Sequence, residues 1–175
     1  MKYFNGFSLS NEEELFNFWL QNKNKYLIAG FSYGSIKALK YVLNSNKRVD
    51  KLVLISPAYF NDRNDAFKKT QLIHFKKDTI KYMNTFLKNI SSGSEINLTK
   101  YVKIGTIKEL EELLTFKWKL KDLKKIAENG TKIEVVLGEN DKIINSKEAL
   151  VFFEQVATVY FIKNANHILK EVKND

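Results

Sequence analysis

The chain has 175 residues, 44% of them hydrophobic, which suits one well-packed core and is too short for two ordinary domains, so we expect a single domain over 1–175. It has no cysteine and two histidines, so disulfides and thiolate metal sites are excluded and we expect neither a metal nor a cofactor. The net charge is +9, and residues 61–125 supply +7 of it, which favours an anionic partner or, equally, lysine-rich helix surfaces with no partner. No apolar run approaches the ~18 residues needed to cross a bilayer, and residues 1–7 lack a signal-peptide core, so we expect a cytoplasmic protein without membrane insertion.

Five short segments rich in β-branched residues are predicted strands. Most are nearly continuous apolar runs, which is typical of strands buried on both faces of a parallel sheet. Helical patterns lie between them, so right-handed crossovers predict a doubly wound sheet. The predicted strands are 2–4, 26–29, 51–55, 132–137 and 158–162.

Helices are predicted where apolar residues recur every three or four positions. The first covers 10–22 and opens with a capping box formed by Ser10 and Glu13; others follow near 36–43 and 149–153, and a short one near 169–172. Residues 59–120 have helical periodicity and no convincing strand. An insertion there, at the carboxyl edge of the sheet, predicts a helical lid over a ligand crevice.

The sequence LIAGFSYGSIKAL, residues 27–39, contains the pattern G-x-S-x-G between a predicted strand and a predicted helix. Gly30 and Gly34 flank Ser32, as a sharp and crowded turn requires, because a Cβ atom would not fit there. The helix start that follows favours developing negative charge. This context predicts Ser32 as a nucleophile; the alternative is a plain glycine turn.

A serine nucleophile needs a base and a residue that orients it. Asp141 follows the fourth predicted strand and His167 follows the fifth, in the order Ser, Asp, His. Alone, Asp141 would be interpreted as a turn residue and His167 as a surface histidine. A parallel sheet brings all three loops to one edge, so we predict Ser32, Asp141 and His167 as a catalytic triad.

An acyl-transfer intermediate also needs two N–H donors. The amide of Tyr33 is one candidate, and the amide of Phe7, after the Gly6 turn, is the second, although that loop also fits an ordinary strand-to-helix turn. We expect His74 to be structural or to face a partner. The expected pocket residues are Phe31, Tyr59 and Phe60, for which core packing is the alternative.

Over its whole length the sequence resembles the α/β-hydrolases. More narrowly, residues 3–20, 30–39 and 164–172 (YFNGFSLSNEEELFNFWL, GFSYGSIKAL and NANHILKEV) resemble the short carboxylesterases that act on pimeloyl-acyl carrier protein methyl ester in biotin synthesis. The resemblance implies a reduced α/β-hydrolase fold with about five mainly parallel strands, flanking helices and a helical lid over 59–120. The sequence departs from the superfamily pattern in two ways. It lacks the usual N-terminal strands, and its oxyanion loop has Asn-Gly where many relatives have His-Gly.

The same resemblance implies the triad and oxyanion donors given above, and an acyl carrier protein bearing a methyl pimeloyl group as the partner, with no nucleic acid. Basic lid residues would receive the acidic carrier; the candidates are Lys68, Lys69, Lys76 and Lys77. Two other functions fit the sequence. One is a different carboxylesterase or thioesterase with the same triad, and the other is an inactive basic binding protein on a hydrolase scaffold.

Overall fold

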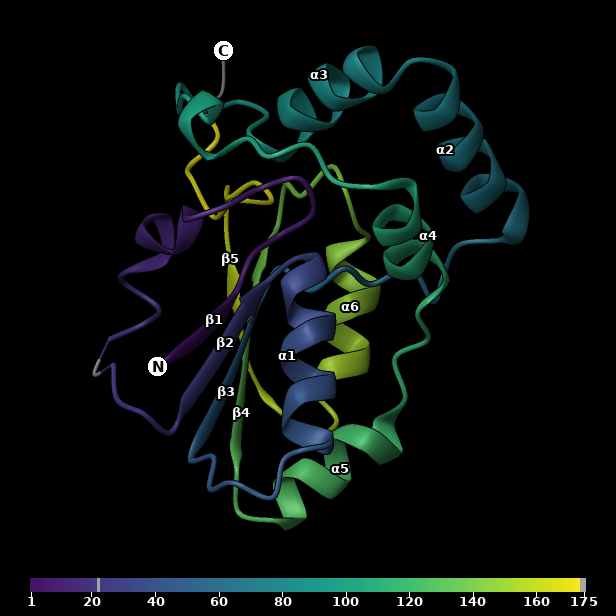
Figure 1. Ribbon diagram of the computed structural model, residues 1–175. Helices are drawn as coiled ribbons and strands as arrows, with labels where there is room; N and C mark the ends of the chain where they lie inside the picture. Colours follow the sequence, from purple (N-terminus) through teal and green to yellow (C-terminus); the bar gives the residue numbers. More distant parts are fainter. Residues whose placement is uncertain (22, 174–175) are drawn as a thin grey trace.

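The computed structural model of the chain describes residues 1–21 and 23–173. Its centre is a sheet of five parallel strands in the sequential order β1-β2-β3-β4-β5 (Figure 1). The predicted strands are confirmed, with β2 two residues and β4 one residue longer at the carboxyl end. The strands are β1 Lys2–Phe4, β2 Leu27–Phe31, β3 Lys51–Ile55, β4 Lys132–Gly138 and β5 Thr158–Ile162.

Helices α1 Tyr33–Leu43, α5 Leu120–Glu128 and α6 Ser146–Phe153 all lie on one face of the sheet (Figure 1). Right-handed crossovers between strands in sequential order return on the same side, which explains this arrangement. The other face packs against the 3-10 helix η1 Glu12–Phe16 and against residues of the segment after β3, among them Ile90, and in the described part of the chain no α-helix runs along it. The prediction of a doubly wound sheet is therefore wrong in this respect.

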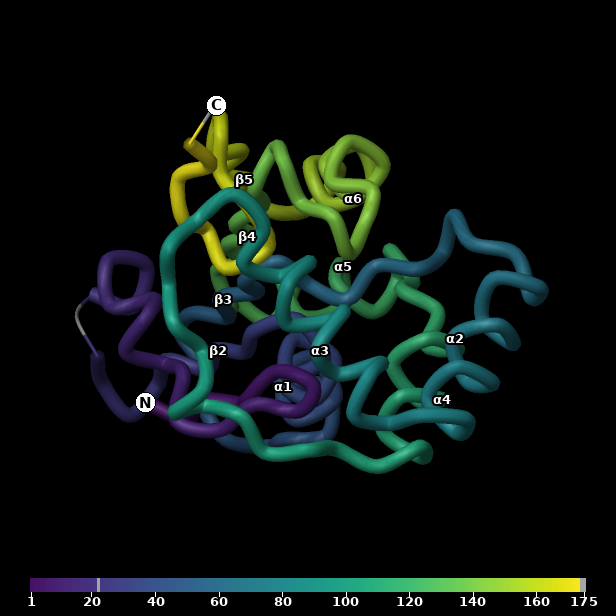
Figure 2. The backbone as a smooth tube through the Cα atoms, turned by 90° about the horizontal axis from the view of Figure 1, so that it is seen from above, coloured from purple at the N-terminus to yellow at the C-terminus, as the bar shows by residue number. Residues whose placement is uncertain are grey.

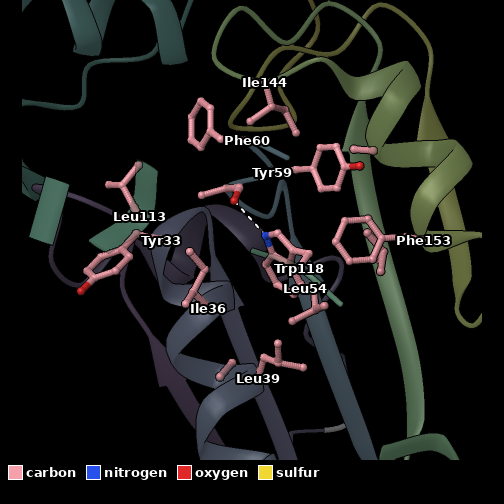
Figure 3. Close-up of a cluster of buried hydrophobic side chains, with 14 of the residues drawn as sticks. Tyr33, Ile36, Leu39, Leu54, Tyr59, Phe60, Leu113, Trp118, Ile144 and Phe153 are labelled. Atoms are coloured by element: carbon pink, nitrogen blue, oxygen red, sulfur yellow. Dashed lines mark hydrogen bonds between the residues drawn. The ribbon is translucent and has the colours of Figure 1, made fainter. Parts of the chain in front are cut away.

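The main core lies between the sheet and helices α1, α5 and α6. Figure 3 shows Ile36 and Leu39 of α1 beside Leu54 of β3, with Trp118 and Phe153 filling the space toward α6. The buried Trp118 indole N–H donates a hydrogen bond of 2.9 Å to the backbone oxygen of Ala58, so its one polar atom is satisfied. The bond from Trp118 to Ala58 holds the segment that directly follows β3 against the core.

Four of the helical elements between β3 and β4 form a layer above the carboxyl ends of the strands (Figures 1 and 2). Asn64 caps α2 and Asp78 caps α3 through their side-chain oxygens, and Thr106 and Glu109 form a capping box at α4. The elements are α2 Asp65–Lys77, α3 Thr79–Ile90, the 3-10 helix η2 Thr99–Tyr101 and α4 Ile107–Thr115.

The two ends of this layer meet at one place. The Asn61 amide donates to the backbone oxygen of Trp118 at 2.9 Å, and its carbonyl accepts from the Trp118 N–H at 3.1 Å. Because these residues are 57 positions apart, the pair closes residues 61–118 into a loop that leaves and rejoins the sheet region at one point. In the described part of the chain, no helix is both long and apolar enough to span a membrane.

Two predicted helices do not form. Residues 12–16 make only a 3-10 helix, Asn11 before it has φ 58°, and no side-chain cap forms. The Ser10 hydroxyl instead donates to the backbone oxygen of Tyr101 at 3.4 Å. The predicted Ser10–Glu13 capping box is therefore wrong, and the predicted helix end, Asn22, lies outside the described residues. Residues 169–172 are not helical either, because Leu169 has φ 57° and the chain turns back to pair Ala165 with Glu171.

Candidate active site

Ser32 occupies the single residue between the end of β2 and the start of α1. Its backbone has φ 51° and ψ −115°, outside the regions of helix and strand. Its N–H donates to the Ile55 oxygen at 2.8 Å, and its own carbonyl accepts from the Ala58 N–H at 3.2 Å. The end of β3 therefore holds this strained residue from both sides.

The flanking glycines are required by the closeness of neighbouring backbone. A Cβ on Gly30 would lie 2.2 Å from the Gly34 oxygen, and one on Gly34 would lie 1.9 Å from the Phe4 oxygen. The Ser35 hydroxyl donates to the Gly30 oxygen at 2.7 Å and closes the turn. The sharp turn predicted from G-x-S-x-G is thus present, with the first strand pressed against it.

The structure brings Ser32, His167 and Asp141 into one hydrogen-bonded row. His167 Nδ1 lies 2.6 Å from Asp141 Oδ2, and His167 Nε2 lies 3.0 Å from Ser32 Oγ. Because the carboxylate only accepts, Nδ1 carries the proton and Nε2 is left to accept from the serine hydroxyl. The side chains of Asp141 and His167 are fully buried, and Ser32 is 4% exposed.

Backbone groups fix the carboxylate of Asp141 at the far end of this row. Its Oδ1 accepts from the N–H groups of Ile143 and Ile144 at 2.7 and 3.1 Å, which leaves Oδ2 for the imidazole. The Phe31 ring packs 5.1 Å from the imidazole, centroid to centroid. The imidazole is therefore held by its partners on two sides.

Asn166 holds the histidine loop and was not identified from the sequence. It is fully buried, and its amide donates at 3.1 Å both to the Ser92 oxygen and to the Ser94 hydroxyl. Its oxygen accepts from the N–H groups of Ile168 and Lys170. The only signal in the sequence was an asparagine directly before the histidine, which does not distinguish this role from a turn.

The two predicted oxyanion donors are the backbone N–H groups of Phe7 and Tyr33. Tyr33 begins α1, and among the described residues no acceptor pairs with the N–H of Tyr33 or of Phe7. The Phe7 side chain lines the same cavity as Ser32. Their role as donors stays a prediction.

The Tyr33 side chain connects this turn to helix α4. Its hydroxyl donates to Glu112 Oε2 at 2.6 Å, and Lys40 of α1 pairs with the same carboxylate. Lys40 and then Tyr33 lower the pKa of the Glu112 carboxyl. A second pair, Lys37 with Glu109 at 3.5 Å, lies along the same contact.

A cavity of about 570 Å³ opens above Ser32, between the sheet edge and the helices of residues 61–118. Of the three predicted pocket residues only Phe60 lines it. The other two predictions are wrong: Phe31 lies beneath the imidazole, and Tyr59 packs against Phe152 and Phe153. The apolar lining that the sequence analysis missed comes largely from helical positions of the inserted segment: Phe67, Phe86, Leu110, Leu113 and Leu114.

Charged side chains surround the mouth of the cavity. Lys77, Lys81, Lys142 and the exposed His74 line it, with Asp78 as the acidic member. His167, and not His74, contacts Ser32, and the expectation that His74 is structural or faces a partner stays a prediction. The balance of charge at the mouth is positive.

The predicted carrier-docking lysines divide into two groups. Lys69, Lys76 and Lys77 are exposed, whereas Lys68 is only 5% exposed. Burial, together with Lys117 beside it, lowers the pKa of the Lys68 amine. A buried ammonium group cannot meet a protein partner, so the prediction for Lys68 is wrong. Within residues 1–21 and 23–173, no cluster of three or more His, Cys, Asp or Glu side chains is arranged to hold a metal ion.

No protein-family profile and no curated protein sequence matches this chain. Solved structures do. A bromoperoxidase from Bacillus anthracis matches with a TM-score of 0.65 at 17% identity, over 90% of this chain and 64% of that one. The carboxylesterase CesB from Bacillus subtilis matches with a TM-score of 0.53 at 17% identity, over 81% of this chain and 53% of that one.

A third match has nearly the same length. BioG from Haemophilus influenzae has a TM-score of 0.61 at 13% identity, over 95% of this chain and 87% of that one. The chain has the α/β-hydrolase fold. It has this fold in a reduced form, because it spans only 53–64% of the length of the carboxylesterase and the bromoperoxidase. Its five parallel strands, its flanking helices and the helical segment after β3 are the parts predicted from the sequence.

Proposed function

We propose that the chain is a serine carboxylesterase whose catalytic triad is Ser32, His167 and Asp141. The observation that carries the proposal is the row from Ser32 Oγ through the imidazole to the Asp141 carboxylate, with contacts of 3.0 and 2.6 Å, at the base of a cavity. A buried row of this kind activates a hydroxyl that is otherwise a poor nucleophile at neutral pH. The α/β-hydrolase fold of the carboxylesterase CesB supports the same reaction class.

In the proposed reaction Ser32 Oγ attacks the ester carbonyl while His167 Nε2 takes its proton. The N–H groups of Phe7 and Tyr33 would bind the oxyanion of the tetrahedral intermediate. The intermediate collapses as His167 returns the proton to the leaving alkoxide, which departs as methanol and leaves an acyl-serine. Water, deprotonated by His167, then attacks the acyl-serine and releases the carboxylic acid and Ser32, while Asp141 stabilises the imidazolium formed in each half.

The substrate that we propose is the methyl ester of pimeloyl-acyl carrier protein, as in biotin synthesis. The resemblance of residues 3–20, 30–39 and 164–172 to the short esterases of that reaction supports it, as does the agreement in length with BioG. An apolar cavity of about 570 Å³ suits a carbon chain, and its volume lies in the usual range for small-molecule sites.

Residues 61–118 would act as a lid on which the carrier docks. Helices α2 and α3 contain six lysines against one aspartate, with Asp78 between them, and a surface of that sign attracts an acidic protein. Ile73 and Ile80 are each 60% exposed among these lysines and would add apolar contact. Because Lys77 and Lys81 also line the cavity mouth, a carrier bound there would deliver its arm toward Ser32, so that only the distal ester reaches the hydroxyl.

A fluorophosphonate probe tests the chemistry without assuming the substrate. The wild-type protein should be labelled and Ser32→Ala should not, with both folded by circular dichroism. Absence of labelling in the wild-type protein would favour the inactive binding protein over any esterase.

Substrate preference is a separate test. We would compare kcat/KM for pimeloyl-carrier methyl ester, short aryl esters and an acyl-carrier thioester. The value should be highest for pimeloyl-carrier methyl ester. Growth rescue of a cell lacking its own pimeloyl-carrier methyl esterase, by the wild-type chain and not by Ser32→Ala, should agree. Equal hydrolysis of all three substrates would leave the triad and reject the substrate.

A further inference from the structure

A buried carboxylate, Glu12, lies beside the loop that joins β1 to η1 and has no part in the reaction described above. It begins η1 and is 0% exposed, whereas Glu14 two positions later is exposed. Burying a carboxylate costs free energy unless hydrogen bonds compensate, so its place in the core needs an explanation. Burial raises the pKa of the Glu12 carboxyl.

One oxygen of Glu12 has two donors. Oε1 accepts from the Gly6 N–H at 2.7 Å and from the Tyr3 hydroxyl at 3.2 Å. Oε2 is buried, and no donor in the described part of the chain reaches it. The Glu12 carboxylate therefore binds one backbone N–H of the loop and one side-chain hydroxyl of β1, and among the described residues its second oxygen has no donor.

The loop held by Glu12 is the one predicted to carry an oxyanion donor. The Gly6 carbonyl accepts from the Leu9 N–H at 3.3 Å, so both polar groups of Gly6 are engaged. Glu12 holds the N–H of the Asn5–Gly6 peptide, and Leu9 holds the carbonyl of the next planar unit, Gly6–Phe7, which also contains the Phe7 N–H. Holding the peptides on both sides of Gly6 restricts rotation at this glycine and so fixes the direction of the Phe7 N–H. On the opposite side the loop has no free space, because a Cβ on Gly6 would lie 2.7 Å from the Phe31 ring.

We propose that Glu12 is a positioning residue of the esterase, which holds the Asn5–Gly6 peptide and so restrains the adjoining Gly6–Phe7 peptide, whose Phe7 N–H then points at the oxyanion. The inference rests on the proposed function, since it assigns no chemistry of its own to Glu12. The Phe31 ring joins the two parts of the site, because it contacts Gly6 on one side and packs 5.1 Å from His167 on the other. Loss of the Glu12 hydrogen bond would release the Asn5–Gly6 peptide and allow rotation at Gly6, while the triad stays in place.

Three substitutions separate positioning from plain support of the fold. Glu12→Gln keeps an oxygen acceptor for the Gly6 N–H, Glu12→Leu removes it, and Glu12→Asp keeps the charge on a side chain one methylene shorter. The control is Glu13→Leu, because Glu13 is partly exposed and, within the described ranges, its carboxylate pairs with Lys23 alone, at the surface. Each variant is assayed for kcat and KM on a short aryl ester, for the rate of fluorophosphonate labelling and for its melting temperature.

We expect Glu12→Leu and Glu12→Asp to lower kcat and the labelling rate about 10–100-fold, with KM within about twofold, because misdirecting an oxyanion donor affects the transition state. Glu12→Gln should stay within about threefold of wild type in kcat, and Glu13→Leu should match wild type. If Glu12→Leu does not fold, the comparison of Glu12→Asp with Glu12→Gln decides. A folded Glu12→Asp with wild-type kcat would overturn the inference and leave the esterase proposal intact, whereas an inactive wild-type protein would overturn the esterase proposal itself.

Discussion

Replacement of Gly34 by alanine tests whether the crowded turn around Ser32 determines the geometry of the site. A Cβ there would lie 1.9 Å from the Phe4 oxygen, 2.6 Å from its carbonyl carbon and 2.7 Å from the Asn5 oxygen. All three atoms are backbone, so no side chain can rotate away. Either β1 and the loop after it, or the start of α1, must move by about 1.5 Å to restore ordinary contact.

This movement should change stability and activity together. Overpacking against fixed backbone costs about 3 kcal/mol or more, which for a chain of this length lowers Tm by roughly 6–12 °C. The same shift separates the Phe7 and Tyr33 N–H groups from each other, and a displacement of about 1 Å in an active site can lower kcat about 100-fold. Differential scanning calorimetry and kcat on a short aryl ester measure the two effects.

Gly130→Ala is the matched control. Gly130 has φ +82°, and a Cβ there would meet nothing within 4 Å, so only backbone strain of about 1 kcal/mol applies. It lies just before β4, at the end of the sheet away from Ser32. We expect a small loss of stability and unchanged kcat. A Gly34→Ala protein with the stability and activity of the Gly130→Ala protein would refute the reasoning.

Three further predictions concern the row, the lid contact and the docking surface. Asp141→Asn should lower kcat by about 10⁴-fold at neutral pH with KM little changed, because the imidazole loses the acceptor that fixes its tautomer; a loss below tenfold would contradict the assigned role. Glu112 has a lowered pKa, so its stabilising contribution is present above the ordinary value of 4.5 and is lost as the pH falls through the folded-state pKa; the Tm difference between wild type and Glu112→Gln should therefore shrink on acidification, and a constant difference would contradict it. Lys69→Glu combined with Lys76→Glu should raise KM for a carrier-bound ester about tenfold or more while leaving a free aryl ester unaffected, and the effect should fade at high salt; equal losses on both substrates would argue against docking there.

The sheet and the three residues of the row could be predicted from the sequence because each depends on a strong local signal. Strands β2, β3 and β4 are almost entirely buried, so their apolar runs have few other interpretations. A parallel sheet then carries the loops after β2, β4 and β5 to the same edge whatever their spacing in the chain. That topology, rather than any one motif, brought Asp141 and His167 to Ser32.

The errors arose where a side chain's direction depends on distant contacts. Glu12 belongs to a run of three glutamates that is typical of a solvated helix start, and the hydrogen bonds that it accepts from the Gly6 N–H and the Tyr3 hydroxyl hold it inside. Phe31 and Tyr59 are near the site in sequence, yet the alternation along β2 and the packing of α6 turn them away from the cavity. Lys68 faces inward from α2, a direction that its neighbours in sequence do not reveal.

The pairing of Asn61 with Trp118 has an evolutionary consequence. Since the inserted segment departs and returns at a single anchored position, its interior can lengthen, shorten or be exchanged with little strain on the strands beneath. Selection can then change the lining of the cavity while Ser32, His167 and Asp141 keep their places on the sheet. A chain this short could therefore change what it binds by replacing one segment, without altering the hydrogen-bonded row.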